Sequence, residues 1–471
     1  MGVDVLDLSP HLNPLPPWGE ETIFWLNWGI TGLERAGSER ELRYMIGLAR
    51  DEQEMLEGRE GPARQKAMEL LVKYADGLGA ERFVDTNSVT IIAGSIPDIK
   101  IIEKVVPSLD ADEIASKFLL DSDEWVVLDK VKAFTTTNAT FRDQRYPDLQ
   151  RGGKAHCVLL QKMVDYLKRV GVIHLATCTP YQVGNVPMKG EHCAWTESSA
   201  VAFCNSVLGA CTNIEGLHSS FASAVTGKTP FWGMHLDENR LGKVIIDVEI
   251  DVDLLRDWYL IGYYVGGQVG LNVPIYTNIQ KVPDMPRLMA MCAAGIAGGS
   301  IVKFHIVGIT LEAPTLEAAS GNRKGLLVLK YGRNERRAAY EKLNHSDSDR
   351  VDVVVLGCPH AGLDRMRVIA GMLEGKKINQ NTRLYVTTCH PMRHVADEQG
   401  YTEIITRAGG SVWEDSCGLV LSVDPSTVFA CDSAKMANYL PGETGSKNTL
   451  FGTTEECIEA ALTGKWRGEL K

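Results

Sequence analysis

Residues 351–375 read VDVVVLGCPHAGLDRMRVIAGMLEG, and this stretch decides the fold. Its run of branched apolar residues predicts a strand over 351–357 that is buried on both faces. Helical spacing of apolar residues follows over 363–375, and a second strand is predicted over 382–388. Strands and helices that alternate at this length are typical of a parallel sheet covered by helices.

The same alternation extends in both directions. Further helical segments are predicted over 51–79, 392–410 and 454–464, and further strands over 89–95, 172–177, 299–310, 411–415, 418–423 and 428–433. The pattern predicts an α/β protein built from several parallel-sheet units around a central crevice. The polar segment 344–352 (NHSDSDRVD) is the best candidate for a boundary, so we expect domains over 45–344 and 345–471.

Residues 1–44 differ from the rest of the chain. Three of the nine tryptophans lie here, together with a proline-rich run over 14–17. We interpret this segment as an extension outside the main fold, with Met45 as a plausible true start. An arm packed on the body through its tryptophans is the alternative.

Charge and hydropathy exclude several classes of protein. The 471 residues include 49 Lys and Arg against 60 Asp and Glu, for a net charge of −11. Nucleic acids and anionic membrane surfaces both attract cationic proteins, so neither is an expected partner. No apolar run approaches the roughly 20 residues that span a bilayer. No secretory signal is readable, which predicts a cytoplasmic protein with reduced thiols.

The eleven cysteines contain no C-x-x-C pair, so a zinc ribbon or ferredoxin loop is disfavoured. Most cysteines of this kind are small buried residues, and we expect this of Cys204, Cys292 and Cys457. Ligand sites of parallel sheets lie at the carboxyl ends of strands. The cysteines in or just after predicted strand ends are Cys178, Cys358, Cys417 and Cys389. Position alone therefore does not select three of the four.

Polar residues are densest over 178–216 (CTPYQVGNVPMKGEHCAWTESSAVAFCNSVLGACTNIEG). A helix is predicted from TESSAVAFCNSVLGA, and the free N–H groups of such a start can bind a carboxylate or phosphate. The catalytic candidates here are His192, Glu197 and Ser198. The substrate-binding candidates here are Thr179, Asn185, Ser199, Asn205, Ser206 and Thr212. A simple helix cap with polar turns is the alternative interpretation.

Outside that segment, His360 in GCPH and Lys435 in DSAKMANYLPG both open helices, and we add them to the catalytic candidates. Ser433, just before Lys435, is a further substrate-binding candidate. His305 lies inside an apolar strand and is as easily a core residue as a ligand. Phosphate-binding G-x-x-x-x-G-K-[ST] loops and G-x-S-x-G elbows are absent from the sequence.

Several long motifs resemble the large-subunit domain of aconitase X. They are DEQEMLEGREGPARQKAMELLVKYADGLGAERFV, ATCTPYQVGNVPMKGEHCAWTESSAVAFCNSVLGA, GGSIVKFHIVGITLEAP, CPHAGL, DSAKMANYLPG and LFGTTEECIEAALTGKW. The resemblance covers roughly residues 50–466 in family order. It implies an aconitase-like fold and a hydro-lyase, that is, a dehydratase.

The resemblance also implies an iron–sulfur cluster held by three cysteines. Carried over to this chain, the ligands are Cys178, Cys358 and Cys417, with Cys292 in reserve. One iron without a fourth protein ligand acts as a Lewis acid on a substrate hydroxyl. Cluster nuclearity, 2Fe-2S or 4Fe-4S, stays open. In the family a small swivelling domain, fused or separate, carries a serine proposed as the base. This chain lacks that domain, so a separate small subunit is the expected partner.

Family substrates are cis-3-hydroxy-L-proline and mevalonate 5-phosphate, and the sequence departs from the family pattern near the site. Where the family commonly has R-T-N-R, this chain has Cys211, Thr212, Asn213 and Ile214. Thr90 stands where a histidine is frequent, and TTTNATFRD lacks the usual Asn-Pro-Ala-Gly. Arginine is the usual bidentate ligand of phosphate. We therefore expect cis-3-hydroxy-L-proline or a related hydroxy acid, with mevalonate 5-phosphate as the alternative.

Two alternatives of other classes stay open. A non-catalytic iron–sulfur or redox-sensing protein would also explain the missing arginines. A thiol-rich enzyme without metal is the third interpretation.

Overall fold

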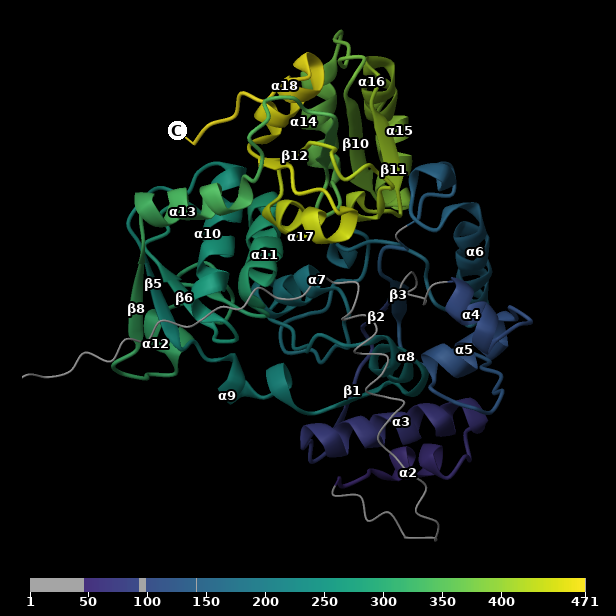
Figure 1. Ribbon diagram of the computed structural model, residues 1–471. Coiled ribbons are helices and arrows are strands. Elements are labelled where there is room, and N and C mark those ends of the chain that lie inside the picture. The colour runs from purple at the N-terminus through teal and green to yellow at the C-terminus, as the bar shows by residue number, and fades with distance from the viewer. Residues whose placement is uncertain (1–45, 93–98, 141, 471) are drawn as a thin grey trace, which may run out of the picture. The chain divides into compact units, whose positions relative to one another are not determined.

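The computed structural model describes residues 46–92, 99–140 and 142–470 (Figure 1). The extension predicted over residues 1–44 lies outside the described residues. The helices in the first half of the chain are α2 (Arg50–Leu56), α3 (Pro62–Leu78), α4 (Ile99–Val105), α5 (Ala111–Leu119), α6 (Gly153–Arg169), α7 (Ser198–Phe203), α8 (Leu217–Thr226) and α9 (Asp237–Arg240). Those in the second half are α10 (Leu255–Val269), α11 (Met285–Gly299), α12 (Leu316–Ser320), α13 (Arg333–Leu343), α14 (Leu363–Leu373), α15 (His390–Glu398), α16 (Tyr401–Ala408), α17 (Ala434–Thr444) and α18 (Thr454–Thr463).

The C-terminal part contains a five-stranded sheet in the order β11-β10-β9-β12-β13, with every pair parallel. Its strands are β9 (Val353–Leu356), β10 (Arg383–Thr388), β11 (Ser411–Glu414), β12 (Phe429–Cys431) and β13 (Thr449–Phe451). The chain runs outward from β9 in one direction and then returns to place β12 on its other side. The strand order therefore reverses at β9 and β12, and such a reversal is where parallel sheets bind ligands.

Alternation along β9 explains why its sequence is apolar throughout. Val353 and Val355 belong to the core that also contains α10 and α17. Val354 and Leu356 belong to a second core with α14, α16 and α18. Successive side chains of a strand point to opposite faces, so both faces are covered by helices. This confirms the prediction made from residues 351–375.

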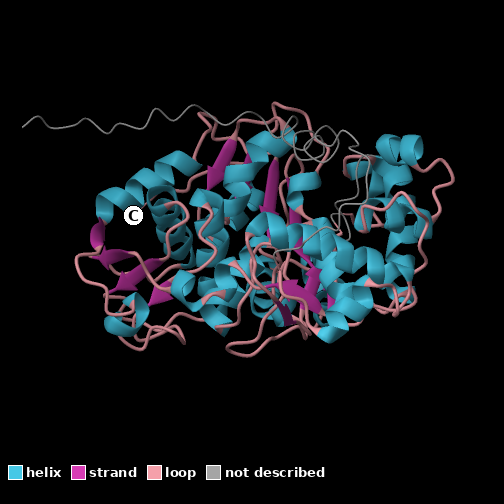
Figure 2. Ribbon diagram, turned by 90° about the horizontal axis from the view of Figure 1, so that it is seen from below, coloured by secondary structure: helices cyan, strands magenta, loops and turns pink. Residues whose placement is uncertain are grey.

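A second parallel sheet has the order β7-β6-β5-β8. Its strands are β5 (Val244–Val248), β6 (Pro274–Thr277), β7 (His305–Ile306) and β8 (Leu327–Tyr331). Two further pairs are β1 (Phe83–Asp85) with β4 (Lys228–Pro230), antiparallel, and β2 (Val89–Ile91) with β3 (Thr135–Thr137), parallel. The α/β fold with several parallel sheets is therefore as predicted. Figure 2 shows the short strands between layers of helix.

Helices α10 and α11 pack unusually closely because glycines line their contact. A Cβ added at Gly299 would lie 1.9 Å from the carbonyl oxygen of Gly266, and one at Gly262 would lie 2.7 Å from that of Met291. Helix α11 also packs against α7 and α17 (Figure 1). The close approach thus helps to set the positions of two helices that carry candidate site residues.

Three predicted strands are largely or wholly absent. Over 172–177 only Ile173 pairs, with Thr136, because the N–H groups of Leu175 and Ala176 bond to the hydroxyl of Thr137. The strand predicted over 299–310 is reduced to β7. Residues 418–423 begin with a 3₁₀ turn (Gly418–Val420), so the strand predicted there was wrong. The chain leaves the sheet at Asp415, whose φ of 61° cannot continue a strand.

Candidate functional site

The three cysteines expected as ligands meet at the carboxyl edge of the five-stranded sheet. Cys358 follows β9, and Cys417 follows β11 in the loop that begins at Asp415. Cys178 comes from the loop after Ile173, and its sulfur accepts a hydrogen bond from the backbone N–H of His360 at 3.2 Å. Cys358 interacts electrostatically with both Cys178 and Cys417. Cys178 and Cys417, 239 residues apart in sequence, therefore converge beside the strand-order reversal.

Each of the three sulfurs receives a hydrogen bond that favours the thiolate. The donors are the N–H of His360 for Cys178, the hydroxyl of Ser433 for Cys358 and the N–H of Leu419 for Cys417. Burial nevertheless raises the pKa of all three thiols, that of Cys417 to about 12. Buried thiolates need a cation, and hydrogen bonds to sulfur are a feature of iron–sulfur ligands. This donor set fits such a cluster.

His360 links the loops of all three cysteines. Besides its N–H bond to Cys178, its ring Nε2 lies 2.8 Å from the carbonyl oxygen of Ser416, next to Cys417. Its Nδ1 lies 3.3 Å from the hydroxyl of Thr177, which in turn contacts Thr179 at 3.0 Å. Burial lowers the pKa of His360, so the ring is neutral. Both ring nitrogens are engaged, and this histidine is arranged to position the loops rather than to move a proton.

A buried ion pair lies beside the thiols. Nζ of Lys435, in the first turn of α17, is 2.5 Å from Oε1 of Glu197, the N-cap residue of α7. Asn138 and Ser199 donate further hydrogen bonds to the same carboxylate, at 3.2 and 2.9 Å. Burial would raise the pKa of Glu197, but Lys435 and these donors lower it below its usual value. Glu197 is therefore ionised and a weak base.

Two serine hydroxyls lie next to this ion pair. The hydroxyls of Ser198 and Ser199 both lie 3.4 Å from Nζ of Lys435. Burial would lower the pKa of Lys435, but Glu197 and the thiols raise it above its usual value. An ammonium with hydroxyls at this distance can turn toward a substrate carboxylate. We call Cys178, Cys358, Cys417, Glu197 and Lys435 the cysteine site.

Other predicted residues lie in a second buried polar cluster. The side chain of Asn205 bonds to both backbone groups of Thr212, and the hydroxyl of Ser206 accepts a bond from Phe304 N–H. Arg240 bonds to Asn205 and pairs with Glu312. The ammonium of Lys303 bonds to the carbonyl of Asn205 at 2.7 Å and to Glu312 at 3.0 Å. We call this the Arg240 network, and it stands apart from the thiol contacts.

Asn185 and His192 also have partners elsewhere. Asn185 joins β2 to β3, because its amide donates to Val89 O and to the hydroxyl of Thr136 while its oxygen accepts from Ser88. Nδ1 of His192 lies 3.0 Å from Nδ1 of His235, and its ring meets Phe231 edge-on. The roles predicted for these two residues stay predictions, and neither contacts Glu197 or Lys435 among the bonds of the described residues.

Sequence reasoning missed three neighbours of the site. Asn138 holds Glu197, Thr177 holds the ring of His360, and the carbonyl of Ser416 receives that ring's other nitrogen. Asn138 lies in TTTNATFRD, a segment that departs from the resembled family, so it carried a signal. Thr177 and Ser416 each directly precede a candidate ligand. Ser416 acts through its backbone carbonyl, which every residue type has, so its contact could not be predicted from the sequence.

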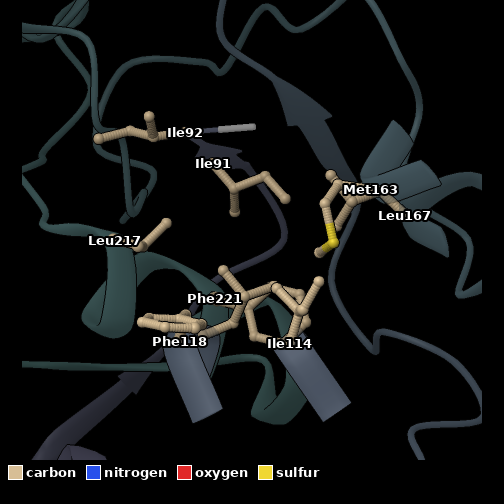
Figure 3. Close-up of a pocket in the computed structure, with 9 residues that line it drawn as sticks. Ile91, Ile92, Ile114, Phe118, Met163, Leu167, Leu217 and Phe221 are labelled. Atoms are coloured by element: carbon tan, nitrogen blue, oxygen red, sulfur yellow. The ribbon is translucent and has the colours of Figure 1, made fainter. Parts of the chain in front are cut away.

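An apolar cavity lies in a further core, formed by residues of α3, α5, α6 and α8, and is unrelated to this chemistry. Ile91, Ile114, Met163 and Phe221 are among the side chains that line it (Figure 3). Its volume of about 20 Å³ is room for roughly one water molecule. A hydroxy acid would find neither space nor a polar partner there. Among the described residues, no helix has both the length and the hydropathy that a membrane crossing requires.

Family profiles match nearly the whole described chain. Profiles described as the first, second and third domains of Aconitase X match residues 45–238, 242–341 and 351–463. The chain belongs to the aconitase X family. Relatives that match most of this chain are named as dehydratases, and a dehydratase is a hydro-lyase. This chain is therefore a hydro-lyase.

Two kinds of relative and one solved structure resemble the chain over most of its length. The phosphomevalonate dehydratase large subunit of Methanocaldococcus jannaschii is 34% identical, over 88% of this chain and 99% of its own. The cis-3-hydroxy-L-proline dehydratase of Hypocrea jecorina is 30% identical, over 89% of this chain and 69% of its own. The crystal structure of Thermococcus kodakaraensis aconitase X (holo-form) has a TM-score of 0.74 and 33% identity, and the match covers 88% of this chain and 100% of that one.

Proposed function

We propose that this chain is the large subunit of a two-subunit, cytoplasmic dehydratase whose iron–sulfur cluster is held by Cys178, Cys358 and Cys417. The observation that carries the proposal is that each of these sulfurs accepts a hydrogen bond, beside a cationic Lys435. A bound cluster supplies a Lewis-acidic iron for the substrate hydroxyl. The domains proposed over 45–344 and 345–471 would then share the site.

The residues of this chain bind and orient the substrate. Lys435 attracts a substrate carboxylate, and Ser198 offers a hydroxyl donor within reach of the same group, whereas the Ser199 hydroxyl donates to Glu197. Preorganised donors of this kind stabilise the charge that develops when a proton leaves the carbon next to a carboxylate. The side chains of Lys435 and Glu197 are only 14% and 13% exposed, and this partial exclusion of water strengthens each of these interactions.

The base is proposed to come from the small subunit. Within the described residues of this chain, Glu197 is held by three donors, and both ring nitrogens of His360 are engaged. Neither is suited to accept a proton. The relatives named as large subunits support a separate partner, as does the part of the cis-3-hydroxy-L-proline dehydratases that this chain leaves unmatched.

Charge favours a zwitterionic hydroxy acid such as cis-3-hydroxy-L-proline. The site offers one cation, Lys435, and one anion, Glu197, which match the carboxylate and the amine of an amino acid. A phosphate would call for additional cations, and Cys211 and Ile214 supply none. Mevalonate 5-phosphate is the second candidate, because three relatives named phosphomevalonate dehydratase large subunit are 34–36% identical to this chain.

The test is an assay of the chain purified anaerobically with its small subunit. Both substrates are offered side by side, and formation of the unsaturated product is followed. We expect turnover of cis-3-hydroxy-L-proline that depends on the small subunit and disappears in Lys435→Met. Turnover of mevalonate 5-phosphate alone would overturn the substrate, and full activity without the small subunit would overturn the two-subunit proposal.

A further inference from the structure

A second group of metal-ligating side chains lies outside the cysteine site. His174, His390 and Asp415 each present one ligand atom, and these atoms all lie within 4.8 Å of one another. His174 comes from the segment after α6, His390 opens α15, and Asp415 follows β11. They therefore join the part of the chain matched as the first domain to the part matched as the third. Among the described residues, this is the one such group of three.

The carboxylate of Asp415 is the centre of the group. Its oxygens lie 3.0 and 3.1 Å from Nδ1 of His390, and Nε2 of His174 is 3.8 Å from one of them. Two ligands about 2.0–2.2 Å from one tetrahedral ion lie roughly 3.3–3.6 Å apart. The observed separations bracket that range, so an ion could be accommodated with small side-chain movements.

The surroundings hold these ligands in position. The backbone N–H of His390 donates to Asp415 Oδ1 at 2.8 Å, and the two imidazole rings stack with centroids 5.3 Å apart. Nδ1 of His174 lies 3.1 Å from the hydroxyl of Thr137, which turns Nε2 toward Asp415. A hydrogen bond at the nitrogen that does not bind metal is the usual arrangement of a ligating histidine.

The ligands are also accessible and suitably charged. The side chain of His390 is 39% exposed, while those of His174 and Asp415 are 13% and 16% exposed, so one side of the group opens to solvent. Burial lowers the pKa of His174 to about 4, although Asp415 opposes the shift, so this ring is neutral at pH 7. A neutral imidazole has a lone pair to give, and solvent can fill the remaining coordination positions.

We propose that His174, His390 and Asp415 form a binding site for a divalent transition-metal ion of the zinc class, distinct from the cysteine site. Two imidazoles and one carboxylate suit Zn²⁺ and related ions better than Ca²⁺ or Mg²⁺, which prefer oxygen ligands. The ion ties the loop before Cys178 to the loop before Cys417 from the solvent side. This binding does not require the proposed dehydratase chemistry.

Zinc binding to the whole protein, isolated anaerobically with its metal content intact, tests the site. Equilibrium dialysis is run on the wild type, His174→Ala, His390→Ala and the control His394→Ala. His394 lies on the same helix α15, with its side chain 77% exposed. We expect one zinc ion bound by the wild type and by the control, and affinity at least tenfold weaker in the other two. Equal binding by all four proteins would overturn the proposal.

Zinc K-edge X-ray absorption separates this site from the thiols. Nitrogen and oxygen ligands lie about 2.0–2.2 Å from zinc, whereas thiolate sulfur lies about 2.3 Å away. We expect nitrogen and oxygen alone in the wild type, and a sulfur shell would overturn the assignment. Thr137→Val is a milder variant, expected to weaken zinc binding roughly 10–100-fold through loss of the bond to His174. If zinc affinity is unchanged in Thr137→Val and also in His174→Ala, His174 is not a ligand and the three-residue site is overturned.

Discussion

The cysteine site and the Arg240 network each contain an ion pair that is largely shielded from solvent. Residues 178–216 contribute side chains to both. In the Arg240 network the guanidinium is saturated by protein, because Arg240 bonds to Glu312 and to the carbonyls of Asn205, Ala210 and Met234. In the cysteine site, hydroxyls stand 3.4 Å from Lys435, and this lysine is the cation among the described residues that acts on all three thiols. Saturated polar groups hold a fold together, and unsaturated ones are available to a ligand.

Replacing the lysine of each cluster gives the largest expected contrast. Lys435→Met removes the ammonium that we propose binds the substrate carboxylate, and we expect kcat/KM to fall about 10²–10³-fold. Lys303→Met removes the buried lysine of the Arg240 network, and we expect activity per folded molecule to be retained. Assays are made on protein whose visible absorption matches the wild type. The contrast fails if the two variants lose activity equally.

For the free energy of unfolding, we expect the larger loss from a substitution in the Arg240 network. Arg240→Met leaves Glu312 as a buried charge with fewer partners, and we expect the free energy of unfolding to fall by about 3–5 kcal/mol. Arg407→Met is the matched control, because its pair with Glu403 is exposed on α16 and such pairs contribute roughly 0.5 kcal/mol or less. Urea unfolding measures both. A loss below about 1 kcal/mol for Arg240→Met would show that the network is not structural.

Acid should weaken the Arg240 network by a smaller amount. Burial lowers the pKa of His305, whose Nε2 bonds to the carbonyl of Arg240, to about 4, and that of His235 to about 3. Unfolded histidine has a pKa near 6.5, so between about pH 6.5 and 4 the unfolded chain binds protons that the folded chain does not. Stability is therefore fully present above pH 6.5 and falls as pH decreases through that window.

His305→Gln tests this pH dependence, because an amide can still donate to Arg240 but does not titrate. We expect the loss of stability between pH 6.5 and 4.5 to be smaller than in the wild type, by on the order of 2 kcal/mol. Urea midpoints measured at several pH values for both proteins give the difference. Parallel curves would mean that His305 is not the group that titrates.

The fold was predictable where local pattern and packing agree. Residues 351–375 gave a strand and a helix because every apolar position of β9 is buried in one of two cores. The 3₁₀ turn at Gly418–Val420 was not predictable, because its apolar residues have the pattern of a strand. No strand forms there because β11 is the edge of the sheet and the chain leaves it. The strand pairing at Ile173 is likewise short because the hydroxyl of Thr137 accepts hydrogen bonds from the next backbone N–H groups, those of Leu175 and Ala176.

The site was predictable in part. Strand-end position suggested four cysteines, and the family resemblance selected three that the structure brings together. Cys389, the fourth, instead interacts with the hydroxyl of Thr177 and with Asp415. Residue type alone could not separate Glu197 from Asn205, since both lie in one polar segment. The difference is whether a partner distant in sequence completes the hydrogen bonds, and a single sequence does not contain that information.

Iron and acid-labile sulfide per chain test the central claim most directly. The wild type, Cys358→Ser and Cys292→Ser are purified anaerobically and compared; Cys292 is a buried cysteine in the middle of α11. We predict a brown wild type and a brown Cys292→Ser with equal iron and sulfide, and a Cys358→Ser protein that folds but loses the colour. An iron-free wild type, or a Cys358→Ser protein with undiminished iron and sulfide, would contradict the account.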